Sequence, residues 1–229
     1  MTNAYLQKLK ILKNTQANLK NEELIRNLSC EIAALAPEKE KSKAMAICLR
    51  KLRELKNEKG RTQKACQMKR VNLGKLFENA ILSADIILSE KGKRIEFSFE
   101  NEETDCDPEA IIDTFLNLIS NSAKFGKGEN IRAELFKKEG FCCFKIKNEG
   151  AADFSSFSSG GGIASCKNIA RLHGGRLLFS TDGKTTCSGF SILHRDESFD
   201  SWQGPSFTDY LEDSFSPVRV GLCDVEARH

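Results

Sequence analysis

One segment of the 229-residue chain constrains the fold more than any other: residues 106–125, CDPEAIIDTFLNLISNSAKF. Asp107 suits the cap of a helix, Pro108 its first position, and Glu109 the positive end of the helix dipole. The residues that follow form a long apolar interior. The segment therefore predicts a helix that is buried against other elements.

The segments around this helix predict further helices and strands. Residues 71–92 have the pattern of a helix stopped by Gly92, and residues 94–100 alternate as a half-buried strand does. Helical periodicity returns near residues 163–172. Strand patterns occupy residues 131–138, 141–148, 175–183 and 187–194. Strand pairs mixed with helices indicate an α+β two-layer sandwich.

The first 60 residues predict a helical hairpin. From Tyr5 to Leu35, leucine and isoleucine recur at helical steps, which makes one face of an amphipathic helix. Pro37 ends that helix and suits the first turn of the next one, which continues over residues 38–60. Two helices alone bury too little apolar surface. We therefore expect the hairpin to pair with its copy as a four-helix bundle in a homodimer.

These patterns divide the chain into three parts. Residues 1–70 form the hairpin, residues 71–194 the sandwich, and residues 195–229 a tail whose weak periodicity predicts irregular or partly ordered structure. The net charge is about +10 over residues 1–72 and about −5 over the tail. The basic residues interleave with apolar ones and lack accompanying aromatic residues, so they indicate a solvated helix face rather than a nucleic-acid surface. The acidic tail has the charge to pack against the basic hairpin.

The cysteines and the apolar runs bear on the cellular compartment. The nine cysteines are scattered and form no CxxC pair, which indicates reduced thiols in a cytoplasmic protein rather than a zinc or redox site. No run approaches the roughly 18 apolar residues that cross a bilayer, and the first residues lack a signal peptide's apolar core.

Two segments carry candidate chemistry. Asn117, Asn121 and Lys124 fall at steps of four and three, so one face of the predicted helix carries two amides and an ammonium group. They either cap neighbouring backbone groups or bind Mg²⁺ and phosphate. The second segment, SSGGGIASCKNIARLHGG from Ser158 to Gly175, is a linker, a phosphate-binding loop, or a site where His173 does chemistry.

Taken together, these segments resemble a known family. The order of DPEAIIDTFLNLISNSAKF, KIKNEG, FSSF, GGGIASCKNIARLHGG and a closing strand pair is similar to the ATP-binding (Bergerat) domain of two-component sensor histidine kinases, in the GHKL ATPase superfamily. The resemblance covers about residues 71–194. It implies that the glycine segment is a phosphate loop followed by a helix, with His173 in a packing role.

The resemblance also implies a set of ligands for ATP and Mg²⁺. Asn121 would bind Mg²⁺ with Asn117 beside it, Lys124 would lie near the phosphates, and Phe125 would line the nucleotide pocket. Asn148 stands where the family has an aspartate that accepts a hydrogen bond from adenine, and Gly150 follows it. The phosphate loop would rest on small residues with exposed backbone amides, which are Gly160 and Gly162.

The hairpin resembles the family's dimerisation and phosphotransfer domain but departs from it more. That domain carries a histidine that accepts the phosphoryl group, followed by an acid. The nearest match here is Ser29-Cys30-Glu31, which places Cys30 at the acceptor position and Glu31 at the acid. The only histidines of the chain are His173, His194 and His229, so no hairpin histidine is available.

Two functions follow from the resemblance. The first is a histidine-kinase-like protein that binds Mg-ATP and acts in a phosphorelay, with a response regulator or another phosphorelay protein as its partner. The second is a pseudokinase that acts as a dimeric scaffold or regulator. ATP hydrolysis of the gyrase or chaperone type is disfavoured, because those relatives have a glutamate base where this chain has Asn117, and an amide does not take a proton from water.

Overall fold

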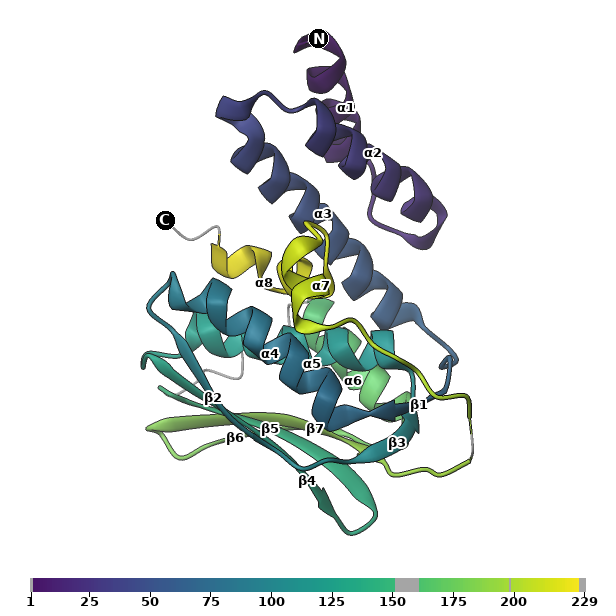
Figure 1. Ribbon diagram of the computed structural model, residues 1–229, viewed down its shortest axis with the longest axis vertical. Helices are drawn as coiled ribbons and strands as arrows, with labels where there is room; N and C mark the ends of the chain where they lie inside the picture. The colour runs from purple at the N-terminus through teal and green to yellow at the C-terminus, as the bar shows by residue number, and fades with distance from the viewer. Residues whose placement is uncertain (1, 151–160, 198, 227–229) are drawn as a thin grey trace.

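The computed structural model describes residues 2–150, 161–197 and 199–226 (Figure 1). At the N-terminus, the first two α-helices project away from a sandwich in which helices cover one face of a sheet, and the third runs from them onto the helical layer. Two further helices follow the last strand and lie beside the helical layer. The predicted fold class is confirmed: a helical N-terminal part precedes an α/β sandwich.

The N-terminal part has three α-helices rather than the predicted two. They are α1 (Thr2–Asn14), α2 (Glu22–Leu35) and α3 (Lys41–Thr62), with single 3-10 turns η1 (Leu19–Asn21) and η2 (Glu38–Glu40) between them. The prediction of one continuous helix from Tyr5 to Leu35 is wrong. Polar groups end it, because the Thr15 hydroxyl donates to the Ile11 carbonyl and the Asn18 side chain caps η1.

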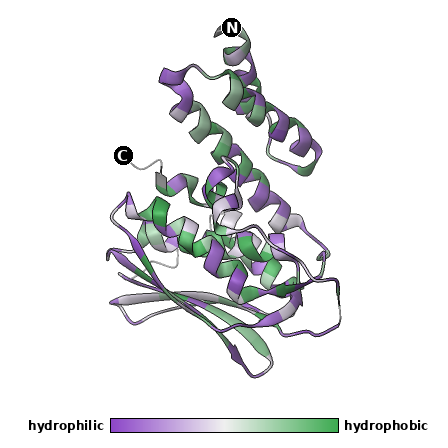
Figure 2. Cartoon of the chain, in the orientation of Figure 1, coloured by the Kyte–Doolittle hydropathy of each residue, from purple (hydrophilic) through white to green (hydrophobic). Residues whose placement is uncertain are grey.

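The three helices share a small apolar core of their own. Each is amphipathic, and Figure 2 shows hydrophobic and hydrophilic residues on all three. α1 folds back onto α2, so Tyr5 and Leu12 are buried beside Ile25 and Ile32. The apolar face that a second chain was expected to cover is therefore partly covered by α1 of the same chain.

The sandwich contains a mixed five-stranded sheet in the order β2-β4-β5-β7-β6. β2 pairs with β4 in parallel and the other neighbours are antiparallel. The strands are β2 (Arg94–Phe99), β4 (Asn130–Lys138), β5 (Phe141–Glu149), β6 (Leu177–Thr181) and β7 (Thr185–Leu193). A separate antiparallel pair joins β1 (Lys69–Asn72) to β3 (Glu103–Cys106), which sequence patterns did not predict.

Three helices cover the sheet: α4 (Leu73–Ser89), α5 (Pro108–Phe125) and α6 (Gly161–Leu172). α5 is the segment that the sequence marked as buried, and Asp107 caps it by accepting from the Ala110 N–H group. Its apolar side faces an aromatic cluster. The Phe115 ring lies 4.5 Å from that of Phe77 and 4.6 Å from that of Phe144. The main core is therefore built around α5.

The tail contains two helices, so of the two predicted alternatives the irregular one is wrong and the partly ordered one holds. It forms α7 (Phe207–Glu212), which begins with a capping box of Ser206 and Asp209, and α8 (Pro217–Glu226). α8 contacts α3, α4 and α5. Val218 and Leu222 enter the core of the sandwich, while Val220 and Cys223 enter that of the N-terminal helices.

α8 therefore connects the two cores. The expected packing of acidic tail against basic hairpin is present where Asp224 of α8 meets Arg53 of α3, 3.4 Å apart. Among the described residues, no helix combines the length and apolar character needed to cross a membrane.

Candidate functional site

The polar face of α5 meets α3 rather than solvent. Asn117 is buried, with 6% of its surface exposed. Its amide nitrogen donates to Asn57 Oδ1 at 3.1 Å, and its oxygen accepts from Arg53 Nη2 at 3.3 Å. Both Asn57 and Arg53 belong to α3. The amide is thus satisfied on both sides by side chains of α3, and neither of its two partners is a backbone group of the kind that the capping alternative expected.

Arg53 connects three helices. Besides Asn117, its guanidinium donates to Ser120 Oγ of α5 at 3.1 Å and to the Gly221 carbonyl of α8. It also lies 3.4 Å from the Asp224 carboxylate. Because an arginine is almost never buried without such partners, this side chain indicates that the docking of α3 on the sandwich is specific.

Lys124, expected near phosphates, faces the same carboxylate. Its ammonium group lies 3.4 Å from Asp224 Oδ2. Burial alone would raise the pKa of the Asp224 carboxyl, but Arg53 and Lys124 outweigh it and lower that pKa below its usual value. The Asp224 carboxylate of α8 therefore neutralises two cations, Arg53 and Lys124, near the C-terminal end of α5.

Three other residues expected to contact a nucleotide border one narrow cavity. Asn121, Phe125 and Asn148 border one cavity together with Leu118, Ser122, Phe179, Thr186 and Ser188. The cavity measures about 10 Å³, close to the minimum that holds one water molecule. Asn148 is 7% exposed, and its amide nitrogen donates to the Glu149 carbonyl at 3.2 Å.

The glycine segment is described only from Gly161 onward. Gly150 has φ +109°, a conformation that favours glycine, and its carbonyl accepts from Thr186 Oγ1 at 2.6 Å. Gly162 lies against α5, where an added Cβ atom would stand 3.2 Å from Asn117 Oδ1. The expected contributions of Gly160 and of the FSSF segment, residues 154–157, lie outside the described residues.

His173 ties the end of α6 to the start of α5. It is 1% exposed, its Nδ1 lies 2.8 Å from the Ile169 carbonyl, and its Nε2 accepts from the Asp107 N–H group at 3.0 Å. Both contacts together fit a neutral ring with the proton on Nδ1. Burial lowers the pKa of this imidazole, which keeps it neutral. These contacts fit the packing role that the resemblance implied.

The hairpin residues expected at the phosphotransfer position lie on α2. Cys30 is exposed. Glu31 forms an ion pair with Lys8 of α1 at 2.7 Å. α2 packs on α1 and α3. Cys30 and Glu31 are therefore not brought together with Asn117, Asn121 and Lys124, which all lie on α5.

The arrangement is that of a known class of structure. The chain has the fold of a histidine kinase. It superposes on the histidine kinase AdeS of Acinetobacter baumannii with a TM-score of 0.61 and 13% identity, over 78% of this chain and 98% of AdeS. For full-length ShkA in complex with AMPPNP the TM-score is 0.57 at 14% identity, over 82% of this chain and 42% of ShkA.

The catalytic domain of histidine kinase ThkA, in a nucleotide-free form, matches the sandwich at a TM-score of 0.50 and 19% identity, over 57% of this chain and 99% of that domain. No protein-family model matches the sequence, and no curated protein matches it significantly. At these identities the likeness concerns the histidine-kinase fold, while the chemistry depends on the residues described above.

Sequence reasoning missed three residues of this site: Arg53, Asn57 and Asp224. One signal was available for the first of them. Arg53 follows the buried Leu49 by one helical turn, so a charged residue occupies a position on the apolar side of α3. Such a position calls for a buried partner. Asp224 gave no comparable signal, because the helix that carries it was not predicted.

Proposed function

We propose that the protein is a pseudokinase: a regulator or scaffold in two-component signalling that has the histidine-kinase fold and does not transfer phosphate itself. The observation that carries the proposal is the set of contacts made by the polar face of α5. Asn117 is hydrogen-bonded to α3, and Lys124 is paired with Asp224 of α8. Asn117, which would lie beside the Mg²⁺ ligand Asn121, and Lys124, which would meet phosphate, therefore have protein partners instead.

The charges near Asn117 also disfavour a divalent cation. The Arg53 guanidinium stands 3.3 Å from the Asn117 oxygen, where it would repel a metal ion on the neighbouring Asn121. Among the described residues, no group of three or more His, Cys, Asp or Glu side chains offers an alternative metal site. In this arrangement the residues do not fit Mg²⁺.

The phosphoacceptor position supports the same proposal. The hairpin has no histidine, and Cys30 on α2 has an acidic neighbour, Glu31, that is paired with Lys8. We therefore propose that Cys30 is not phosphorylated by this chain.

Exposed apolar side chains support a proposal about the partners, and the cysteines support one about the cellular compartment. Leu6, Ile11, Leu24 and Leu35 of α1 and α2 each expose more than a third of their surface, which supports contact with a second copy or with a response regulator through these helices. All nine cysteines are free, which supports a reducing, cytoplasmic environment.

Mg-ATP binding is the second candidate function. Asn121, Phe125 and Asn148 do border one cavity, as the resemblance implied. Binding would require this cavity to widen and α3 to move away from Asn117. A ligand stabilises such a minor conformation only by its own differential affinity, so the apparent affinity would be low.

Titration with a fluorescent ATP analogue, with and without Mg²⁺, separates the two functions. The pseudokinase proposal expects no saturable binding up to millimolar nucleotide in the full chain. Saturable, Mg²⁺-dependent binding that is lost in Asn121→Ala would replace it with the second candidate. Incubation with labelled ATP extends the test, because label on Cys30, absent in Cys30→Ser, would show phosphotransfer.

A further inference from the structure

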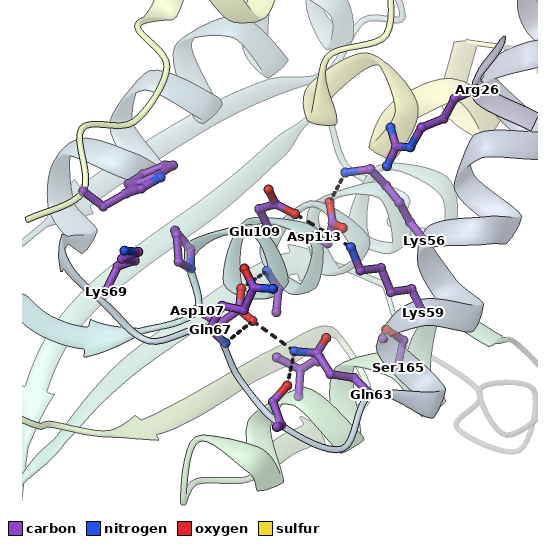
Figure 3. Close-up of a pocket in the computed structure, with 16 residues that line it drawn as sticks. Arg26, Lys56, Lys59, Gln63, Gln67, Lys69, Asp107, Glu109, Asp113 and Ser165 are labelled. Carbon is purple, nitrogen blue, oxygen red and sulfur yellow. Dashed lines mark hydrogen bonds and ion pairs between the residues drawn. The ribbon is translucent and has the colours of Figure 1, made fainter. Parts of the chain in front are cut away.

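A cavity of about 290 Å³ lies between the N-terminal helices and the sandwich, apart from the α5 face described above. One wall is formed by α2 and α3, and the other by β1 and the start of α5 (Figure 3). Trp202, from the segment before α7, also borders it. The volume is near the lower end of small-molecule pockets, roughly 300–1,000 Å³.

Cations from three separate elements converge on this cavity. Arg26 comes from α2, Lys56 and Lys59 from α3, and Lys69 from β1, and Figure 3 shows Lys69 across the cavity from the two α3 lysines. Bringing four like charges together costs free energy unless carboxylates or a bound anion compensate them.

The carboxylates of the lining compensate only part of this charge. The Asp107 carboxylate accepts hydrogen bonds from the Gln63 side chain, the Gln67 N–H group and the Ala110 N–H group. Its capacity to accept hydrogen bonds is therefore used within the protein. Asp113 pairs with Lys56 at 2.6 Å. Of the lining cations, Lys56 is therefore the one with a close carboxylate partner inside the cavity.

Within the described part of the chain, two of the remaining cations, Lys59 and Lys69, lack a close carboxylate partner. Lys59 lies 4.0 Å from Glu109, whose side chain is 82% exposed, so this contact is worth little. Arg26 pairs with Glu22 of its own helix, and no ion pair is seen for Lys69 among the described residues. Lys59 and Lys69 thus flank the cavity with charge left to bind a ligand.

Trp202 adds a flat apolar surface to this charge. Its ring is partly buried against the main core, and its backbone N–H group is fixed by the Arg70 carbonyl at 2.8 Å. A ring held in this way offers a stacking surface at small cost in side-chain entropy. Gln63 and Gln67 supply amide groups nearby.

We propose that this cavity is a binding site for a small aromatic anion, in which Lys59 and Lys69 meet a carboxylate or phosphate group and Trp202 stacks on the ring. Because the two walls belong to different parts of the chain, the ligand would bind α3 and the sandwich together and so stabilise their docking.

Trp202 makes the proposal measurable, because it is the only tryptophan of the chain. The full-length protein is titrated with phenyl phosphate and, separately, with benzoate, and Trp202 fluorescence is recorded. We expect a saturable change with at least one of them, and which one saturates identifies the anionic group. Inorganic phosphate and phenol, which lack the ring or the charge, should bind at least about tenfold more weakly.

Charge variants locate the site. Lys59→Glu and Lys69→Glu should each weaken binding about tenfold, and Glu109→Gln should strengthen it about threefold by removing a competing carboxylate. Lys39→Glu, on η2 and outside the lining, is the matched control and should leave the affinity unchanged. Thermal unfolding of each variant checks that it folds.

Three results would overturn the proposal. The first is no saturable change in Trp202 fluorescence up to about 10 mM of either aromatic anion, because most metabolite sites bind more tightly than that. The others are binding of inorganic phosphate or phenol as tight as that of the aromatic anions, or a loss of affinity in Lys39→Glu equal to that in the two lysine variants of the lining. None of them depends on whether the protein binds ATP, since Asn121 and Asn148 do not line this cavity.

Discussion

The two sides of α5 differ in how their contacts are specified. The side that faces the sheet is apolar and carries Phe115, which stacks on Phe77 at 4.5 Å. The opposite side is polar, and its partners come from 60 to 100 residues away in sequence: Asn57 and Arg53 on α3, and Asp224 on α8. Hydrophobic pattern is sufficient to specify the first side, whereas the second depends on which distant helices dock there.

The largest effect is expected on the apolar side. Phe115→Ala removes a fully buried ring that contacts both Phe77 and Phe144, so it should lower the free energy of unfolding by about 3–5 kcal/mol. Phe125→Ala, at the exposed end of the same helix, is the matched control and should cost less than about 1 kcal/mol. Urea denaturation followed by circular dichroism measures both, and similar losses would show that α5 does not organise the core.

A smaller but still large effect is expected on the polar side. Arg53→Ala leaves the Gly221 carbonyl, Ser120 and Asn117 without their shared donor, while Asp224 keeps Lys124. We expect the free energy of unfolding to fall by about 3 kcal/mol, because removing one partner of a buried ion pair leaves the other polar groups buried without it.

Lys51→Ala is the control for Arg53, because Lys51 pairs with the half-exposed Glu54 on the same helix at 2.8 Å. Lys51→Ala should lower the free energy of unfolding by at most about 1 kcal/mol. Hydrogen exchange of α3 and α8 supplies a second measurement, in which Arg53→Ala should speed exchange in both helices. Unchanged exchange would mean that Arg53 does not fix the docking.

The same contrast explains what could be predicted from the sequence. The caps of α5, its apolar interior and the alternation of the strands are local patterns, and they were sufficient to predict the sandwich, whereas the grouping of Asn121, Phe125 and Asn148 came from the family resemblance.

The helices of the tail were not predicted, because α8 is short and owes its order to burial. Val218 and Leu222 enter the core of the sandwich and Val220 and Cys223 that of the N-terminal helices, and no local pattern encodes these contacts. Arg53 differs from the tail: its charge on the apolar side of α3 was a local signal for a buried partner, but no local pattern identifies its partners on α5 and α8.

The close contact of α3 with α6 gives a third, intermediate test. Gly60 lies so near Ser165 that an added Cβ atom would overlap the Ser165 hydroxyl, and the Asn168 amide donates to the Gly60 carbonyl at 2.9 Å. Gly60→Val should therefore cost about 2 kcal/mol through overpacking. The double variant Gly60→Ala/Ser165→Ala, which removes the overlapping hydroxyl, should stay within about 1 kcal/mol of the parent in urea denaturation. Equal losses of unfolding free energy in Gly60→Val and in the double variant would indicate that α3 and α6 do not approach this closely.

The smallest expected effect is the pH dependence that His173 confers. Burial lowers its pKa from the ordinary 6.5, so the unfolded chain takes up a proton more readily than the folded one. The stability that this group contributes is fully present above pH 6.5 and is lost as the pH falls from there through the folded-state pKa. In the neutral ring, Nε2 accepts a hydrogen bond from the Asp107 N–H group at 3.0 Å. A proton added to Nε2 would point at this N–H group and break the hydrogen bond.

Urea denaturation between about pH 7.5 and 5.5 measures this loss in a window above the titration of most carboxyl groups. His173→Gln keeps a donor and an acceptor but does not titrate, so its stability should vary less with pH than that of the parent, even if it is lower throughout. An equally steep decline in both proteins would assign the pH dependence to other groups, and the contact between α6 and the cap of α5 would then be insensitive to protonation.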